Sequence, residues 1–248
     1  LARRNNKGIY KTINIDANSK ILIENGDKLN VGSLDGDSIN KISLLGEIRN
    51  RGDYEFSDDL TLGKIINIET DLKQSTYTGL TIIKRFNYVT RSHTFLVADL
   101  ISQQRLDGLK LKEGDQIFIL SKNDIDFLNS GVILNFLSSA TSKTFYEENK
   151  ENYKDFSCLE SLNKFGNSDF IKASLLKLKL YKYENFVGCS DLFAGNPSLL
   201  PIALNYSVPV FGMVVNPGVY PISKDVTGGE VITLSGGYLN ESFKELVT

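Results

Sequence analysis

A short stretch is written twice in this chain, and the repeat constrains the fold more than any other feature. Residues 46–66 and 212–232 are identical at 9 of 21 positions, with no gap between the two copies. The identical pairs are Gly46/Gly212, Asn50/Asn216, Gly52/Gly218, Tyr54/Tyr220, Ser57/Ser223, Asp59/Asp225, Thr61/Thr227, Gly63/Gly229 and Ile66/Ile232. A match this dense indicates that the same supersecondary unit occurs twice.

Each copy begins with the pattern of a strand that turns back on itself. Apolar residues precede both copies, as in Val208, Val210 and Phe211, and they predict a largely buried strand. Asn-Xaa-Gly then predicts a turn in which Gly52 and Gly218 take positive φ. Proline before the second glycine favours a type II turn, and because such a turn twists the wrong way for a tight hairpin, we expect a longer loop or a bulge.

A returning strand and a helix complete the unit. Tyr54-Glu55-Phe56 and Tyr220-Pro221-Ile222 alternate as a strand does, and the proline in the second favours an edge position. Thr61 and Thr227 have the character of helix N-caps, and Glu230 completes a capping box in the second copy alone. The predicted unit is therefore strand, turn, strand and helix.

These residues resemble those of a known family. Gly-Glu-Ile-Arg-Asn-Arg-Gly-Asp-Tyr in the first copy and Gly-Met-Val-Val-Asn-Pro-Gly-Val-Tyr-Pro-Ile in the second, each before a Thr-initiated helix, resemble SLBB domains, the soluble-ligand-binding β-grasp modules. Such domains occur in tandem in bacterial outer-membrane polysaccharide export proteins. The second copy also carries Ser235-Gly236-Gly237, similar to the family's Ala-Gly-Gly. The first departs from the pattern with Arg51 for proline and with Ile68-Glu69-Thr70 where the glycine pair is expected.

The fold class that follows is α+β, with tandem β-grasp units and an α/β insert between them. Residues 1–40 hold the C-terminal part of a preceding unit, because Leu22–Leu29 parallels Leu111–Ile117 around a Gly-Asp turn. The remaining segments are a β-grasp unit at 41–124, an α/β insert or linker at 125–206, and the N-terminal part of a further unit at 207–248. Strands are expected at Gly79–Phe86, His93–Asp99, Ile117–Leu120 and Ser174–Tyr183, and helical segments at Val132–Leu137, Cys158–Phe165 and Ser198–Leu204.

The two end segments are complementary in kind. Residues 1–40 contain late strands of a unit without early ones, and residues 207–248 contain early strands without late ones. The halves are expected to belong to different repeats of a longer protein. We expect them to be able to pair, within a chain or between chains, because unpaired strand edges recruit partners.

Composition excludes several function classes. The formal net charge is −2, whereas a nucleic-acid-binding domain usually has a strongly basic face, so no nucleic-acid partner is expected. No apolar run approaches the 18 residues or so of a transmembrane helix. The chain begins with Leu1 rather than methionine, which favours a fragment whose signal peptide, lipid anchor or membrane segment lies outside it.

The residues that usually carry catalysis are sparse. His93 is the one histidine, and its strand-like surroundings favour a surface position over a role as an acid or base. The usual nucleophile, metalloprotease, phosphate-loop and dinucleotide motifs do not occur. Asp35-Gly36-Asp37 is interpreted as a turn, since the further ligands of a calcium loop do not follow. We therefore expect no enzyme, no cofactor and no metal.

Two features remain open at this stage. Cys158 and Cys189 are either buried reduced thiols or a disulfide of an oxidising compartment, and the export resemblance favours the disulfide. The repeated loop either serves only to hold its turn or also presents side chains to a saccharide or a neighbouring subunit. The candidate contact residues are Asn50, Arg51, Tyr54, Asn216 and Tyr220. Of these two contacts, a subunit interface is favoured, because tyrosine and arginine are enriched there.

The resemblance implies a function. It implies the periplasmic portion of a capsule or exopolysaccharide export protein, attached to the outer membrane through segments outside this fragment. Copies would form a ring-shaped conduit that acts passively, with an inner-membrane polysaccharide co-polymerase and the polysaccharide itself as partners. The alternatives are a soluble ligand-binding module and a monomeric accessory periplasmic protein of polysaccharide biosynthesis.

Overall fold

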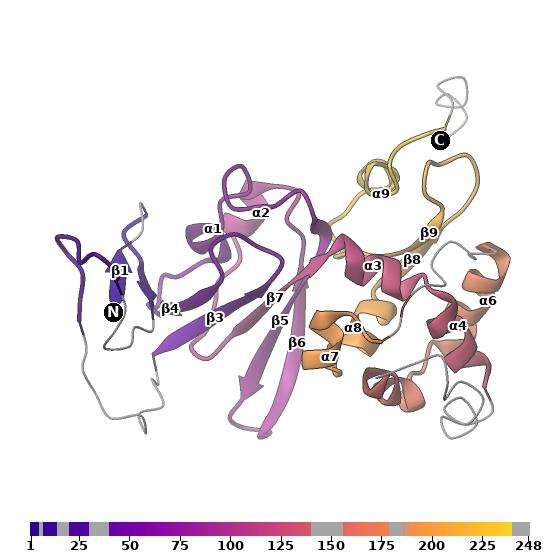
Figure 1. Ribbon diagram of the computed structural model, residues 1–248, viewed down its shortest axis with the longest axis horizontal. Helices are drawn as coiled ribbons and strands as arrows, with labels where there is room; N and C mark the ends of the chain where they lie inside the picture. Colours follow the sequence, from indigo (N-terminus) through magenta and orange to yellow (C-terminus); the bar gives the residue numbers. More distant parts are fainter. Residues whose placement is uncertain are drawn as a thin grey trace. The chain divides into compact units, whose positions relative to one another are not determined.

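The computed structural model describes residues 1–4, 7–13, 20–29, 40–139, 156–178, 186 and 188–239. Figure 1 traces the chain, which is α+β with one mixed seven-stranded sheet and several helices. It divides into two compact units. The first unit comprises residues 1–76 and 81–119, and the second comprises residues 77–80 and 120–248.

The sheet of the first unit has the strand order β1-β2-β4-β3-β7-β5-β6. Its strands are β1 Ala2–Arg4, β2 Tyr10–Thr12, β3 Lys41–Gly46, β4 Gly52–Glu55, β5 Thr76–Asn87, β6 Ser92–Ala98 and β7 Gln116–Ser121. β3 runs antiparallel to β4 and parallel to β7, so the strand latest in sequence lies in the interior of the sheet, between β3 and β5. β5 and β6 form the long antiparallel hairpin visible in Figure 1. Three of the strands predicted from sequence, now β5, β6 and β7, are confirmed.

Helices α1 (Leu62–Ile65) and α2 (Gln103–Asp107) complete this unit and contact each other. The core joins them to alternate residues of the central strands, as the two-residue period of a strand requires. The buried side chains include Ile42, Leu44, Ile117 and Ile119 from the strands and Leu62, Ile65 and Leu106 from the helices. Thr61 caps α1 as predicted, since its side chain accepts a hydrogen bond from the Lys64 amide.

The second unit is largely helical before its two strands. Its elements are α3 Lys122–Leu128, α4 Gly131–Ser138, η1 Ser157–Lys164, α6 Ser168–Leu178, α7 Asp191–Gly195, α8 Leu199–Asn205, β8 Ser207–Val210, β9 Gly218–Pro221 and α9 Gly228–Leu234. The helical segments predicted at 132–137, 158–165 and 198–204 correspond to α4, η1 and α8. All regular elements described between β7 and β8 are helices. The α/β character expected of the insert stays a prediction, because residues 140–155 and 179–185 lie outside the described residues.

The strand predicted at Ser174–Tyr183 is wrong over its described part. Residues as far as Leu178 belong to helix α6, and residues 179–183 lie outside the described residues. Leucine alternates with lysine in this stretch, a pattern typical of a strand with one solvent-exposed face. The helix instead buries Ile171, Ser174 and Leu175, at the three- and four-residue spacing of a helical face, and leaves Leu176 exposed. Apolar residues at helical spacing begin upstream of the alternating stretch, and this longer pattern favours a helix over a strand.

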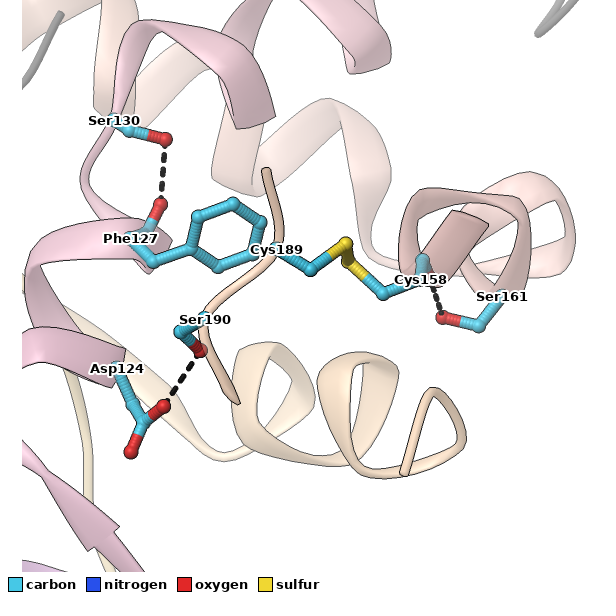
Figure 2. The surroundings of a disulfide bond; sticks show 7 residues. All are labelled: Asp124, Phe127, Ser130, Cys158, Ser161, Cys189 and Ser190. Carbon is cyan, nitrogen blue, oxygen red and sulfur yellow. Dashed lines mark hydrogen bonds between the residues drawn. A yellow bond between two sulfur atoms is a disulfide. The ribbon is translucent and has the colours of Figure 1, made fainter. Parts of the chain in front are cut away.

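A disulfide joins Cys158 in η1 to Cys189 just before α7 (Figure 2). The neighbouring Ser190 donates a hydrogen bond to the carboxylate of Asp124 in α3, with 2.6 Å between the oxygens. Burial raises the pKa of Asp124, and hydrogen bonds from Ser190 and Ser121 act in the opposite direction. Figure 2 also shows the ring of Phe127 directed toward Cys189. The disulfide fixes the chain entering α7 to η1, and the carboxylate of Asp124 fixes it to α3.

The two copies of the repeat have the same strand pairing. β3 and β4 pair Ile42 with Tyr54 and Leu44 with Gly52, and β8 and β9 pair the equivalent residues, Val208 with Tyr220 and Val210 with Gly218. An isolated bridge follows at equivalent positions too, Ile48 with Leu72 and Val214 with Tyr238. Thr227 caps α9 within the predicted capping box. The sequence repeat is therefore a repeat of backbone structure.

The turn differs from the prediction in one respect. Gly52 has a positive φ of 143°, but Gly218 is not among the residues with positive φ. The shared left-handed glycines are instead Gly46 and Gly212, at 92° and 93°. The reason is a tight reversal at the end of the first strand, where the amide two residues later donates to each glycine carbonyl oxygen. The expected longer loop follows that reversal.

The outer edge of β9 is covered by a side chain. The Asn129 amide donates to the Val219 carbonyl oxygen at 2.9 Å, and its oxygen accepts from the Val219 amide at 2.6 Å. In the first copy the equivalent residue, Asp53, pairs with Thr12 of strand β2. One carboxamide thus satisfies the two backbone groups that a neighbouring strand would otherwise bind.

Candidate functional site

Hydrogen bonds from the side chains that recur in both copies hold the loop of the first copy in place. Tyr54 is buried in β4, and its hydroxyl donates a hydrogen bond to the carbonyl oxygen of Asn50. The Asn50 amide donates to the carboxylate of Asp71 at 2.8 Å. The other oxygen of Asp71 accepts from the Asn67 backbone amide at 2.8 Å. The side chain of Asn50 therefore bonds Asp71, after the helix, rather than the backbone of its own turn.

The second copy holds its loop in a related way. Tyr220 donates to the carbonyl oxygen of Asn216, with 2.6 Å between the oxygens. The Asn216 backbone amide donates to the Ser235 carbonyl oxygen at 2.9 Å. A β-carbon added to Gly236 would lie 2.9 Å from the side-chain nitrogen Nδ2 of Asn216, so this glycine permits a close approach of that side chain.

Backbone hydrogen bonds show which residues of the two copies correspond to each other after the helix. The amide of Arg49 donates to Asp71 in the first copy, and the amide of Val215 donates to Gly237 in the second, both at 3.0 Å. The glycine pair is therefore replaced in the first copy by Thr70-Asp71 rather than by part of Ile68-Glu69-Thr70. At this position the first copy carries a carboxylate that ties the loop, where the second has Gly237 with a φ of 85°.

A cleft of about 280 Å³ opens beside the loop in the first unit. It is lined by Arg3, Arg4, Lys7, Lys11, Ile13, Asn50, Tyr54, Ile65, Asn67, Thr70 and Asp71. Four of these side chains are basic and one is acidic. The basic residues come from the N-terminal hairpin of β1 and β2, and the polar ones come from the first copy of the repeat and the residues after its helix. The cleft therefore lies where these two parts of the first unit meet.

The basic residues of the cleft are not equivalent. Arg3 is paired with Asp27 and Glu24, and Lys7 donates to the carbonyl oxygens of Gly63 and Ile66. The ammonium of Lys11 has no hydrogen bond to any described residue, and it lies 5.8 Å from the centre of the Tyr54 ring. Burial lowers the pKa of Lys11, and the nearby Asp71 partly opposes that shift. Lys11 is therefore the cation best placed to meet an anionic or hydroxyl-rich ligand.

The hydroxyl of Tyr54 acts as a hydrogen-bond donor within the loop beside the cleft. Burial, followed by the negative charge of Asp71, raises the pKa of Tyr54 to about 12. The phenol therefore stays protonated at neutral pH and keeps its bond to Asn50. The arrangement suits recognition of anions or hydroxyl groups through lysine and amide donors.

The structure brings together only part of the predicted contact set. Asn50 and Tyr54 line the cleft, whereas Arg51 is exposed and is not part of the lining. Asn216 and Tyr220 belong to the second unit and support their own loop. The sequence reasoning missed Lys11, Asn67 and Asp71. Lys11 reaches the cleft through β2, and no local pattern in the sequence shows that this strand lies beside Tyr54 in β4.

No protein-family model, no curated protein and no solved structure matches this chain. Within the described residues, no helix is both long and apolar enough to cross a membrane. Nor do three potential metal ligands from histidine, cysteine, aspartate or glutamate gather in that part of the chain. Asp35-Gly36-Asp37, interpreted from sequence as a turn, lies outside the described residues.

Proposed function

We propose that this chain is a non-catalytic, β-grasp-containing segment of a bacterial polysaccharide export protein, and that copies of it assemble into part of a conduit. The proposal combines the SLBB resemblance with geometry that suits it. The chain then acts by presenting stacked, rigid modules to each other and to a passing glycan. Its partners are further copies, an inner-membrane polysaccharide co-polymerase and the polysaccharide.

The strand order of the first unit supports the β-grasp assignment. A hairpin (β3 and β4) leads to helix α1, a second hairpin (β5 and β6) follows, and β7 returns between β3 and β5. A hairpin, a helix and a central strand parallel to the first strand are the arrangement that a β-grasp domain has.

The observation that carries the proposal is the shared hydrogen-bond register of the two copies. The same strand pairs and the same bridge after the turn recur at equivalent residues, as do the tyrosine bond and the threonine cap. Two modules with one geometry in one chain suit a tandem array. The residues that repeat are those that hold backbone, which favours a structural role over chemistry.

The disulfide supports a place outside the reducing cytosol. Cys158 and Cys189 are bonded, and structural disulfides persist in oxidising compartments such as the bacterial periplasm. A periplasmic segment of an outer-membrane assembly would meet that condition.

The basic cleft suggests how a glycan is contacted. Lys11 and Asn67 place a cation and an amide at one opening, and sugars offer carboxylates and hydroxyls to such groups. An acidic oligosaccharide is therefore a better ligand than a neutral one.

Binding of oligogalacturonate to the purified chain, followed by NMR chemical-shift changes, tests this role. We expect shifts at Lys11, Asn67 and Thr70 that weaken with added salt, and a loss of affinity of about tenfold in Lys11→Gln, equivalent to about 1.4 kcal/mol. Lys224→Gln is the matched control, because Lys224 is exposed in the second unit. Light scattering of the same sample reports assembly. A chain that stays monomeric and ignores both acidic and neutral oligosaccharides would overturn the proposal.

The cleft also favours the second candidate, a soluble ligand-binding module. A volume of about 280 Å³ is near the lower end for small-ligand pockets. A chain that remains monomeric and retains a small anionic ligand through purification would support this candidate instead.

A further inference from the structure

The end of the β5–β6 hairpin carries several apolar side chains that are in contact with water. Tyr88 is 73% exposed and Val89 is 93% exposed, and both lie in the turn between the two strands. Phe86 and Leu96 lie in the strands themselves, and each is 37% exposed. In Figure 1 this end of the hairpin projects past strands β3 and β7 of the same sheet. Single exposed apolar residues are ordinary on a protein surface, whereas such a group at one end of a hairpin marks a candidate binding surface.

The aromatic rings at this end hold each other in place. Phe86 packs edge-to-face against Tyr88, with the ring centroids 5.0 Å apart and the ring planes at 85°. The ring of His93, the cross-strand partner of Phe86, has its centroid 5.3 Å from that of Phe86. The turn is fixed as well, because the side-chain oxygen of Asn87 accepts a hydrogen bond from the Val89 amide at 2.9 Å. Tyr88 is therefore a preorganised ring with accessible surface, and a ligand that packs on it loses little affinity to the ordering of that side chain.

A groove of about 720 Å³ opens beside these rings. Its volume is within the range of small-ligand sites and exceeds that of the basic cleft. All of its lining residues belong to the first unit. The apolar part of the lining consists of Phe56, Phe86, Tyr88, Val89 and Leu96.

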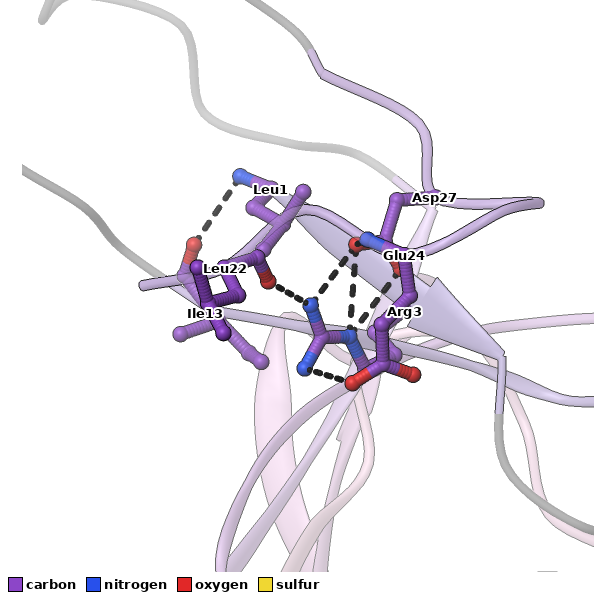
Figure 3. Close-up of polar contacts among 6 residues, drawn as sticks. All are labelled: Leu1, Arg3, Ile13, Leu22, Glu24 and Asp27. Carbon is purple, nitrogen blue, oxygen red and sulfur yellow. Dashed lines mark hydrogen bonds and ion pairs between the residues drawn. The ribbon is translucent and has the colours of Figure 1, made fainter. Parts of the chain in front are cut away.

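The arginine that lines this groove is already neutralised. Arg85 donates through Nε and Nη2 to the two carboxylate oxygens of Asp115, at 2.8 and 2.7 Å. Arg3 at the basic cleft is held by Asp27 through the same two atoms (Figure 3). The side chain of Asp115 is fully buried, so this ion pair fixes the guanidinium group. Arg85 therefore offers no net charge to a ligand.

The other two charged groups of the groove balance each other. Lys112 and Glu113 are adjacent in the turn before β7, and both line the groove. Neither side chain forms an ion pair within the part of the chain that the structure describes. An anionic ligand would be attracted by Lys112 and repelled by Glu113, and a cationic ligand would meet the reverse. A neutral ligand therefore fits this groove better than a charged one, in contrast to the basic cleft.

The uncharged polar groups suit a ligand that both donates and accepts hydrogen bonds. The side-chain nitrogen of Asn87 has no partner among the described residues and is an available donor. The hydroxyl of Thr94 donates to the Arg85 carbonyl oxygen at 3.3 Å and keeps its capacity to accept. Sugar hydroxyls donate and accept through one group, and the C–H groups of a sugar ring form an apolar face that packs on an aromatic ring. A wholly aliphatic ligand would leave the polar groups of the groove unbonded.

We propose that this groove is a second glycan contact, in which an uncharged sugar residue packs against Tyr88 and Phe86. The basic cleft takes the acidic residues of the glycan, and the end of the hairpin takes the neutral ones. The inference rests on the proposed function, in which a polysaccharide is the partner, and it adds the class of sugar that the hairpin binds. A polysaccharide whose repeat contains both kinds of residue then meets both sites on the first unit.

NMR titration of the purified chain with neutral oligosaccharides tests this site. The probes are cellopentaose, maltopentaose, xylopentaose and mannopentaose, which differ in the stereochemistry of their linkages and hydroxyl groups. At least one of them should shift the amide signals of Tyr88, Val89 and Thr94. Added salt should leave this affinity unchanged, because the groove has no net charge to screen. Oligogalacturonate should instead shift the signals of the basic cleft, and that binding should weaken with salt.

Substitutions at Tyr88 identify the ring as the contact. Tyr88→Ala should weaken binding of the neutral probe about fivefold, whereas Tyr88→Phe, which keeps the ring, should retain most of the affinity. Phe170→Ala is the matched control, because it removes a ring that is 54% exposed in the second unit, and it should leave the affinity unchanged. Both positions are exposed, so the variants should fold, and their amide spectra check this directly.

The inference is overturned if no neutral probe shifts the hairpin signals, or if Tyr88→Ala binds the probe as well as the parent chain does. Hairpin signals that respond only to vesicles of phosphatidylethanolamine and phosphatidylglycerol would assign the exposed residues to a membrane surface instead. Signals that respond only to protein concentration would assign them to a contact between copies.

The same titrations separate this inference from the proposed function. Binding of oligogalacturonate at the basic cleft, with no response to any neutral probe, retains the proposed function and rejects the hairpin site. Binding of a neutral probe at the hairpin by a chain that remains monomeric and ignores oligogalacturonate retains the hairpin site and favours a soluble ligand-binding module over a conduit.

Discussion

The hydroxyl of Tyr220 lies 2.6 Å from the carbonyl oxygen of Asn216, four residues earlier, and donates a hydrogen bond to it. Tyr54 makes the same bond to Asn50 in the first copy. Each bond crosses the loop between the two strands of its hairpin and satisfies a carbonyl group that the turn leaves without a ladder partner. The same bond in both copies explains why the asparagine and tyrosine recur together.

Replacing either tyrosine by phenylalanine should lower the free energy of unfolding of its own unit. We expect about 1–2 kcal/mol for Tyr54→Phe and for Tyr220→Phe, since each leaves a carbonyl oxygen without its donor. Urea unfolding followed separately in the two units measures the loss. Tyr88→Phe is the control, because Tyr88 is 73% exposed. Equal stability of all three variants would show that the bond does not hold the loop.

Substitutions at two equivalent glycines, Gly46 and Gly212, distinguish the cost of backbone strain from the cost of close packing. Gly46→Ala and Gly212→Ala place alanine at φ values of 92° and 93°, so both incur a similar conformational penalty of about 1 kcal/mol. Only the Gly46 variant also brings a methyl group against the Ile119 backbone, and we expect it to cost roughly 1–3 kcal/mol more. Thermal unfolding of the two purified variants gives the comparison. A Gly212 variant as unstable as the Gly46 variant would contradict this difference in packing around the two glycines.

Removing the disulfide should destabilise the second unit selectively. The cysteines are 31 residues apart, and closing such a loop contributes roughly 3–4 kcal/mol in the chain-entropy model. Cys158→Ala with Cys189→Ala should therefore shift the unfolding of the second unit to lower denaturant and leave that of the first unchanged. A parallel loss in the first unit would show that the effect is not local.

The buried Tyr54 phenol should make the first unit sensitive to strong alkali. Its pKa is raised from 10 to about 12, so the folded state holds this proton more tightly than the unfolded state does. The associated stability is fully present below pH 10 and is lost as pH rises from 10 toward 12. Difference absorbance between the parent and Tyr54→Phe should show phenolate forming with a midpoint near 12. A midpoint near 10 would contradict the burial and the influence of Asp71.

The sequence predicted what local patterns determine. The repeat, its strands and both threonine caps followed from residue spacing, because alternation and capping are properties of neighbouring residues. The strand predicted over Ser174–Tyr183 failed, since a short leucine–lysine alternation also fits one face of a longer helix. The left-handed glycine was misplaced at Gly218, because the position of the reversal depends on which amide bonds back to the strand end.

The candidate site was less accessible from sequence than the fold. Asn50 and Tyr54 were identified through the repeat, but Asp71, which accepts the hydrogen bond of the Asn50 side chain, replaces a glycine of the second copy and so breaks the repeated pattern. Lys11 reaches the cleft because β2 pairs with β4. Contacts between segments that far apart in the chain depend on tertiary structure, which no local period encodes.

The central claim is that the two copies of the repeat have the same pattern of backbone hydrogen bonds. NMR couplings across hydrogen bonds test this claim most directly. We predict a coupling between the Arg49 amide nitrogen and the Asp71 carbonyl carbon, and an equivalent one between Val215 and Gly237. A second equivalent pair should link Phe56 to Asn40 and Ile222 to Tyr206. The claim would be contradicted if the first copy shows these couplings and the equivalent amides of the second copy couple to different carbonyl groups or to none.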